Sequence, residues 1–260
     1  MSYDELKAQV AEANRVLANV GLSDGAIAGH GHASMRIPDQ PHRFVMKGRG
    51  AVIDVLAKAT ADDMVICDMD AFTVERKGST TPAFEVMMHA CIYRSHPEVQ
   101  TIAHTHARFC AVLSVLQNTI VPMCQEGIPL VRKPLPVYPH VAPVITEEEG
   151  MEVARLLGNS KAILLEGHGA TTTGATLEEA VMNMINLEEQ AKMNWYARCA
   201  AGPDYRRIPE QNLDELSNLR VAPTLPHFKD LLAENAAMVQ EGPRRSGVYA
   251  YYAEMGGPAG

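Results

Sequence analysis

Three histidines of this sequence stand where their side chains could converge on a metal ion. His104 and His106 are two residues apart in the segment AHTH, and the alternation of a strand would place both imidazoles on one face. His168 follows an apolar run and has a glycine on each side, which lets the chain turn sharply beside the ring. Each histidine alone fits an ordinary structural role, but together they predict a divalent metal site with a coordination position left open for catalysis.

A fourth candidate, Glu85, stands near the start of a helical pattern. Apolar residues recur at helical spacing after it, so we expect a helix over 82–94 with Pro82 in the first turn. The helix dipole favours an acidic residue there without any further role. Beside a cation, however, the carboxylate could bind the metal or exchange protons with a substrate. His89 lies one turn later and could be the hydrogen-bond partner of Glu85.

The other expected elements alternate between helices and strands. Helices are expected over 2–20, 107–116, 146–157 and 176–199, and capping boxes are expected at Ser2/Glu5, Thr146/Glu149 and Thr176/Glu179. Strands are expected over 44–46, 64–68, 99–106 and 162–165, with an extended segment over 130–137. The metal-site histidines therefore fall at the ends of strands.

Composition and length limit the class of protein. A chain of 260 residues that is 47% hydrophobic suits one sizeable domain, which we place at residues 1–202. Residues 203–260 are rich in proline, glycine and charge, and are expected to form an arm that packs on the same domain or on a neighbouring subunit.

The charge pattern and the cysteines indicate a cytoplasmic protein without nucleic-acid or membrane partners. The net charge is −8 and no basic cluster is available for phosphates. The N-terminus lacks a signal-peptide pattern, and no stretch approaches the ~20 apolar residues that cross a bilayer. The five cysteines are scattered and form no CxxC pair, which is typical of reduced thiols.

Two segments, PAFEVMMHACIYRSHPEVQTIAHTH and LLEGHGATTTGATLEEAV, resemble the class II aldolase/adducin family. The resemblance covers most of the chain, and the order Glu, HxH, GHG is far more specific than any of its parts. It implies an α/β fold, a three-layer α/β/α sandwich around a mainly antiparallel sheet. It also implies a homo-oligomer, a tetramer or a multiple of it, with sites at subunit interfaces.

The resemblance assigns roles to individual residues. It implies that His104, His106, His168 and Glu85 surround a divalent metal, usually Zn²⁺, with Mn²⁺, Co²⁺ or Fe²⁺ as alternatives. Tyr138 falls near the position of a family tyrosine that donates a proton, although its surroundings, VYPH, depart from the family pattern.

Two departures disfavour a sugar phosphate as substrate. Members that act on phosphorylated sugars bind the phosphate through a GNxS loop and a PSSE helix start. Here the loop reads GHAS over 31–34, which leaves Gly31 and Ser34 as candidate substrate-binding residues and adds His32. The helix start reads PAFE over 82–85, so both of its hydroxyl groups are absent.

A basic loop, MKGRG over 46–50, adds Lys47 and Arg49 beside the expected site. Arginine can bind a carboxylate through two parallel hydrogen bonds, whereas Lys47 alone also fits a solvated turn. These features resemble the aromatic-acid decarboxylase branch of the family. Phe84 could lie against a flat ring, but its spacing with Met87 and Met88 favours the core.

We therefore expect a metal-dependent lyase that decarboxylates a hydroxylated aromatic dicarboxylate, a dihydroxyphthalate-like or hydroxypyridine-dicarboxylate-like acid. Glu85 is the candidate proton donor, with His32 or Tyr138 as alternatives, and Lys47 and Arg49 would hold the retained carboxylate. One rival is an aldolase for a non-phosphorylated hydroxy-oxo acid. The other is a non-enzymatic, adducin-like interaction domain, against which the intact metal ligands argue.

Overall fold

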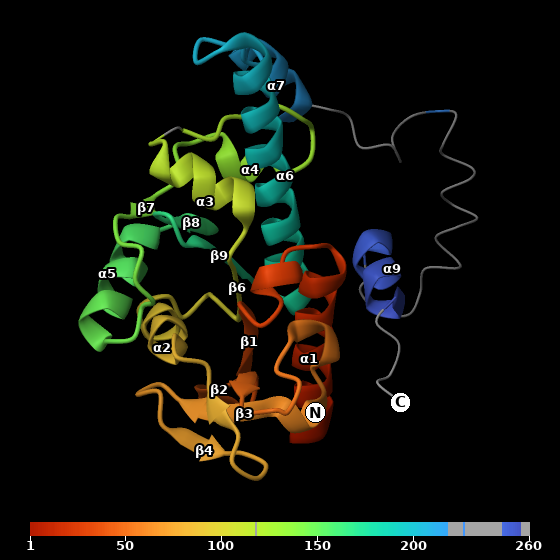
Figure 1. Ribbon diagram of the computed structural model, residues 1–260, viewed down its shortest axis with the longest axis vertical. Coiled ribbons are helices and arrows are strands. Elements are labelled where there is room, and N and C mark those ends of the chain that lie inside the picture. The colour runs from red at the N-terminus through yellow and green to blue at the C-terminus, as the bar shows by residue number, and fades with distance from the viewer. Residues whose placement is uncertain (118, 218–225, 227–245, 256–260) are drawn as a thin grey trace.

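A single mixed sheet forms the centre of the computed structural model, which describes residues 1–117, 119–217, 226 and 246–255 (Figure 1). Its strands are β1 (His32–Ile37), β2 (Gln40–Arg49), β3 (Met64–Asp68), β4 (Thr73–Glu75), β5 (Thr81–Pro82), β6 (Thr101–Thr105), β7 (Val137–Tyr138), β8 (Ala162–Leu165) and β9 (Gly169–Gly174). Eight follow the order β4-β3-β2-β1-β6-β9-β8-β7, and β5 pairs with β2. Only β7 and β8 pair in parallel among these strands, so the predicted, mainly antiparallel sheet is confirmed.

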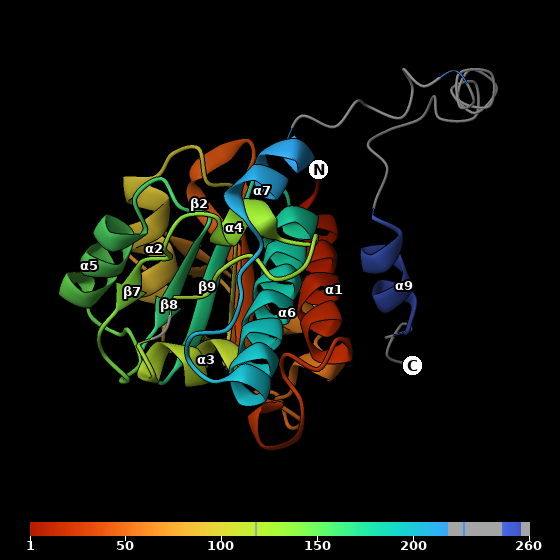
Figure 2. The same ribbon diagram turned by 90° about the horizontal axis from the view of Figure 1, so that it is seen from above.

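Helices cover both faces of this sheet. They are α1 (Tyr3–Asn19), α2 (Val86–Ser95), α3 (Arg108–Val115), α4 (Ile128–Val131), α5 (Glu147–Leu157), α6 (Leu177–Ala201), α7 (Glu210–Ser217) and α9 (Gly247–Met255), with short 3-10 turns at Gly25–Ile27, Leu56–Lys58 and Ala61–Asp63. Figure 2 shows the sheet between α1 and α6 on one side and α2 and α5 on the other. Each face buries its own apolar cluster, which confirms the predicted three layers.

Side-chain caps fix the starts of three helices, largely as predicted. At Ser2 and Thr146 both halves of the capping box form. At Thr176 the hydroxyl accepts the Glu179 N–H, but the Glu179 carboxylate accepts the N–H of Ala175 instead of that of the cap residue. The third box is therefore only half formed.

Two expected elements begin elsewhere. Pro82 is not in a helix, because β5 pairs with Gly48 and Arg49 of β2 and holds the backbone extended. The helix α2 starts only at Val86, and Glu85 is its N-cap residue without a capping bond from its side chain. Residues 130–137 were expected to be extended throughout, but their first part belongs to α4, which has a proline in its first turn.

The described part of the C-terminal arm contacts the same domain. Tyr249 of α9 is buried in the core cluster that contains α1 and α6, and Asn19 donates a hydrogen bond to the Tyr252 carbonyl at 2.8 Å. Residues 218–225, 227–245 and 256–260 of the expected arm lie outside the described residues. Among the described helices, none combines the length and apolar character needed to cross a membrane.

Candidate metal centre

Three neighbouring strands place a row of polar side chains across the sheet. His32 on β1 is the register partner of His104 on β6, and His104 is in turn the partner of Thr171 on β9. Residues directly opposite each other in antiparallel strands project on the same face. The ring centroids of His32 and His104 are accordingly only 5.1 Å apart.

The predicted metal ligands meet at one end of this row. His106 directly follows β6, His168 directly precedes β9, and Glu85 comes from the start of α2. One donor atom from each of these residues and from His104 lies within 4.8 Å of all the others. His168 Nε2 is 3.0 Å from His106 Nε2, and Glu85 Oε2 is 3.3 Å from His104 Nε2. Ligands that surround one tetrahedral ion at zinc distances lie about 3.3 Å apart, so the spacing fits a bound cation.

The hydrogen bonds of His104 prepare one of its nitrogens as a ligand. Thr171 donates its hydroxyl hydrogen to Met88 Sδ at 3.6 Å, so its oxygen is free to accept the Nδ1–H of His104, which lies 3.1 Å away. That assignment leaves the Nε2 lone pair of His104 bare, and this atom is buried without a hydrogen-bond partner among the described residues. A buried lone pair beside a carboxylate is what a divalent cation would satisfy.

Burial keeps two of the histidine ligands neutral. It lowers the pKa of His106 to about 3, and the neighbouring His104 contributes in the same direction. It likewise lowers the pKa of His168 to about 4. Burial alone would raise the pKa of Glu85, but His104 and His32 beside the carboxylate outweigh it and lower that pKa below its ordinary value. Neutral imidazoles at His106 and His168 and an ionised Glu85 carboxylate are the protonation states that metal ligation requires.

A second set of polar side chains continues from Glu85 into the protein. His32 Nε2 lies 3.4 Å from Glu85 Oε2, and His32 Nδ1 lies 2.9 Å from His89 Nε2. His89 Nδ1 is 2.7 Å from Ser34 Oγ, which is 2.7 Å from the Tyr93 hydroxyl. His89 is therefore bound to His32 and Ser34, not to Glu85 as the helix spacing suggested.

Three predicted site residues occupy structural positions. Gly31 has a φ of +103°, and a Cβ there would lie 2.8 Å from the His104 carbonyl oxygen, so glycine permits the close approach of the two segments. Ser34 has no exposed surface, and its hydroxyl is fully engaged. Tyr138 on β7 is buried, and its ring contacts His140.

The basic loop lies at the end of β2 beside Glu85's segment. Lys47 is buried, and its ammonium group binds Asp54 Oδ1 at 2.5 Å. Arg49 is partly exposed, and its Nε lies 3.5 Å from Asp54 Oδ2. The Phe84 side chain is not in the core, as its spacing suggested, but is 73% exposed. The guanidinium carbon of Arg49 lies 5.5 Å from the centre of the Phe84 ring.

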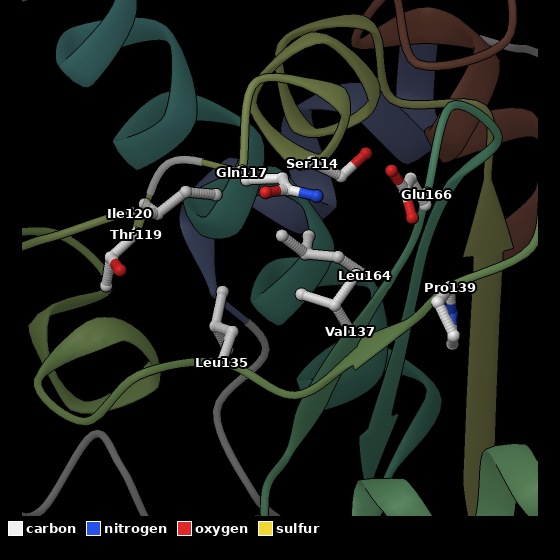
Figure 3. Close-up of a pocket in the computed structure, with 9 residues that line it drawn as sticks. All are labelled: Ser114, Gln117, Thr119, Ile120, Leu135, Val137, Pro139, Leu164 and Glu166. Atoms are coloured by element: carbon white, nitrogen blue, oxygen red, sulfur yellow. The ribbon is translucent and has the colours of Figure 1, made fainter.

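A pocket of about 290 Å³ lies beside β7 and β8 (Figure 3). Its lining consists of Ser114, Gln117, Thr119, Ile120, Leu135, Val137, Pro139, Leu164 and Glu166. None of these residues is a candidate metal ligand, but Ser114 accepts a hydrogen bond from the Gly167 N–H at 3.0 Å and so supports the turn that carries His168.

Comparisons with known proteins agree with this geometry. The sequence profile of the Class II Aldolase and Adducin N-terminal domain matches residues 8–195. A 3,4-dihydroxyphthalate decarboxylase of Terrabacter sp. (strain DBF63) is 30% identical over 81% of this chain and 88% of its own length. A 3-oxo-tetronate 4-phosphate decarboxylase of Pectobacterium atrosepticum is 38% identical over 43% of this chain and 53% of its own.

A solved structure shows the same fold. The L-fuculose 1-phosphate aldolase from Glaciozyma antarctica PI12 superposes with a TM-score of 0.72 and 22% identity, over 97% of this chain and 88% of that one. Decarboxylases and aldolases both break carbon–carbon bonds. The predicted enzyme class, a carbon–carbon lyase, is confirmed by these relatives.

We predict that Thr171→Val lowers metal affinity without unfolding the protein. The substitution keeps the shape of the side chain but removes the oxygen that fixes the His104 tautomer. Loss of such a supporting hydrogen bond typically costs ~10–100-fold in metal affinity. Zinc titration against a competing chelator measures the change. Thr172→Val is the matched control, because its hydroxyl binds the Ala180 carbonyl and not a ligand. Equal affinities for the two variants would contradict this role of Thr171.

We also predict that the metal-free protein loses stability as the pH falls from about 6.5 towards 4. The pKa values of His106 and His168 in the folded state, about 3 and about 4, are depressed. The unfolded chain therefore binds protons first, and the free energy of unfolding decreases on acidification.

Urea unfolding at stepped pH values measures this slope. Carboxylates also titrate near the lower end of the range, so the double variant His106→Gln/His168→Gln is the reference. Its slope between pH 6.5 and 5 should be shallower than that of the wild type. Identical slopes would show that these two histidines are not held neutral by the fold.

Proposed function

Because the chain belongs to the class II aldolase and adducin family, we propose that it is a metal-dependent decarboxylase of a hydroxylated aromatic dicarboxylate. The substrate class is dihydroxyphthalate-like or hydroxypyridine-dicarboxylate-like. One observation carries this proposal beyond the family: the partly exposed guanidinium group of Arg49 lies over the exposed ring of Phe84, the residue that precedes Glu85 in the chain. The similarity to 3,4-dihydroxyphthalate decarboxylases supports the same substrate class.

The pairing of β5 with β2 creates this surface. Thr81 pairs with Arg49, and Pro82 pairs with Gly48, so the residues that follow β5 stay beside the end of β2. Phe84 consequently lies under the Arg49 guanidinium and immediately precedes Glu85 in the chain. A planar acid could stack on the Phe84 ring while its carboxylate meets Arg49. A phosphate would find no hydroxyl group at Ala83 or Phe84.

Arg49 is a better carboxylate ligand than Lys47. The charge of Lys47 is already matched by Asp54, and the Lys47 side chain is buried. Among the described residues, the terminal nitrogens of Arg49 make no hydrogen bond, because only its Nε faces Asp54. In the proposed complex, Arg49 binds the retained carboxylate, while Lys47 acts through Asp54 by holding the loop.

The metal would be held by His104, His106, His168 and Glu85, and Zn²⁺ is our first choice for three imidazoles and a carboxylate. Mn²⁺, Co²⁺ and Fe²⁺ are the alternatives. A bound divalent ion would supply Lewis-acid stabilisation of the negative charge that develops on the substrate oxygens. The buried Nε2 lone pair of His104 is the local feature that supports a cation here.

The ionised state of Glu85 suggests how the proton moves. Its carboxylate accepts the proton of the substrate's ring hydroxyl as the substrate binds. The bond between the ring carbon and the departing carboxylate then breaks, CO2 leaves, and the electron pair stays on the ring carbon. Glu85 returns the proton to that carbon, and the ring oxygen regains a proton from water on release. His32 is placed to orient Glu85, and Tyr138 remains the alternative proton donor.

We further propose that the chain functions as a homo-oligomer, with a tetramer as the expected form. Apolar side chains are exposed beside the turn that carries His168, namely Val115, Leu116 and Val141. A Cβ at Gly167 would touch Val115 and Val141, so this apolar surface adjoins the metal site. Contiguous exposed apolar side chains are typical of subunit contacts.

The proposal predicts that the zinc-loaded protein releases CO2 from a dihydroxyphthalate or a hydroxypyridine dicarboxylate. CO2 is measured over a panel of these acids, together with a sugar phosphate and a non-phosphorylated hydroxy-oxo acid. Glu85→Gln keeps the shape of the side chain but cannot carry the proton, so kcat should fall by ~10²–10⁴-fold. Faster release of an aldehyde or pyruvate from either of the last two compounds would replace the decarboxylase with an aldolase.

Arg49→Ala should raise KM for the aromatic diacid and change kcat much less. A hydrogen bond to a charged group is worth ~1.5–3 kcal/mol, which corresponds to a loss of about 10–150-fold. Arg49→Lys should recover only part of it, because lysine lacks the planar fork. A monoacid without the retained carboxylate serves as the control substrate, and its KM should hardly change. A uniform loss for both acids would mean that Arg49 supports the loop and does not bind the carboxylate.

A further inference from the structure

Five buried side chains alternate between α2 and β1 in a continuous polar chain. Glu85 is the N-cap residue of α2, and His89 and Tyr93 follow it within the helix at intervals of four residues. His32 and Ser34 are two residues apart and lie on one face of β1. The contacts run from Glu85 to His32, then to His89, Ser34 and Tyr93, crossing between helix and strand at each step. Four successive contacts therefore join the α2 segment to β1.

The donors and acceptors that are available fix which group donates at each hydrogen bond of this chain. Within the described structure, the Tyr93 hydroxyl has only Ser34 Oγ as a partner, so the phenol donates to Ser34. The Ser34 hydroxyl then donates to His89 Nδ1, which must be the acceptor nitrogen of a neutral ring. His89 Nε2–H consequently donates to His32 Nδ1. The remaining proton of His32 is on Nε2, the atom that faces Glu85 Oε2.

The opposite direction would leave a buried donor unsatisfied. If His32 carried its proton on Nδ1, each later bond would reverse, and Ser34 would donate to Tyr93. The phenol hydrogen would then have no acceptor among the described residues, in an interior where such a loss is costly. Burial also lowers the pKa values of both His32 and His89, which agrees with two neutral rings.

The far end of the chain is closed to solvent. Tyr93 is buried, its ring packs against Phe44 with centroids 5.2 Å apart, and the Arg36 guanidinium carbon lies 4.8 Å over it. Burial raises the pKa of the Tyr93 phenol, so the hydroxyl remains a donor. A closed chain of this kind can orient groups but offers no path for protons from bulk water.

We propose that His89, Ser34 and Tyr93 are positioning residues, which hold His32 in its Nε2–H form and thereby aim a fixed N–H donor at the Glu85 carboxylate. The other oxygen of that carboxylate, Oε1, accepts the Val144 N–H at 3.2 Å. Glu85 is thus oriented from two sides before substrate arrives. This inference deepens the proposed function, on which its kinetic consequences rest, but the tautomer itself does not depend on the substrate.

The tautomer is read by nitrogen NMR of zinc-loaded protein labelled with ¹⁵N-histidine. Protonated and bare imidazole nitrogens differ in chemical shift, and the His32 signals are identified by their absence in His32→Gln. Wild type should show a protonated Nε2 and a bare Nδ1 at His32. Ser34→Ala and His89→Leu should each move His32 to a mixture of tautomers, whereas His89→Gln, whose amide can still donate to His32, should restore the wild-type pattern.

Turnover supplies the second measurement. His89→Leu should lower kcat by ~10–100-fold, the usual effect of losing a partner behind a site residue, with a smaller change in KM. His89→Gln should recover most of that loss. Thr172→Val is the control, because it removes a buried hydroxyl from β9, another strand of the same sheet. Ser34→Ala removes a single oxygen and remains informative where His89→Leu does not fold.

The outcomes separate this inference from the proposed function. A protonated Nδ1 at His32 in wild type overturns the inference even where CO2 is released. An unchanged His32 tautomer in folded Ser34→Ala and His89→Leu also overturns it. The predicted tautomer and its shifts, found in a protein that decarboxylates none of the acids, would instead support the inference and remove the proposed function.

Discussion

The arrangement of the site depends on one buried carboxylate. Glu85 is almost fully enclosed, and an isolated buried anion would be strongly unfavourable. It is tolerated because it accepts the Val144 N–H and faces His32, and because a cation held together with His104 can share its charge. Because β5 is extended, α2 starts only at Val86 and Glu85 is its N-cap residue. The Glu85 side chain makes no capping hydrogen bond and faces the histidines instead.

The histidines can gather around Glu85 only because three strands approach closely at their ends. A Cβ at Gly169 would lie 2.1 Å from the Thr105 carbonyl oxygen, and one at Gly31 would lie 2.8 Å from that of His104. Glycines at these two points let β1 and β9 close on either side of β6. The register of β1, β6 and β9 then aligns His32, His104 and Thr171.

The sequence predicted the ligands better than the groups that support them. The spacing of His104 and His106, together with the glycines around His168, predicted three histidines that the described structure gathers with Glu85. Thr171 could not be assigned, because GATTTG over 169–174 lacks the alternation of a half-buried strand and both its faces are buried. The strand His32–Ile37 was also not expected. The alignment of His32, His104 and Thr171 across the sheet could therefore not be predicted from the sequence alone.

The errors at Phe84 and His89 have definite physical causes. Helical spacing placed Phe84 in the core, but the residue precedes the helix, so the period of 3.6 does not apply to it. The i,i+4 rule made His89 a partner of Glu85, but at the start of α2 the Glu85 side chain leaves the helix surface. The equal spacing of Glu85, His89 and Tyr93 was the only sequence pattern that related these three residues. It indicates a shared set of polar contacts only when His32 and Ser34 of β1 are known to lie opposite.

Two adjacent histidines are thereby given opposite roles by the groups behind them. Thr171, whose hydrogen is directed to Met88, holds the proton of His104 on Nδ1 and leaves Nε2 as a bare metal ligand. His89 holds the proton of His32 on Nε2, so His32 can donate to Glu85 but cannot bind the ion. The rings are 5.1 Å apart and both face the same carboxylate, so burial and distance do not distinguish them. The direction of their hydrogen bonds therefore explains why His104 can bind the ion, whereas His32 orients the Glu85 carboxylate.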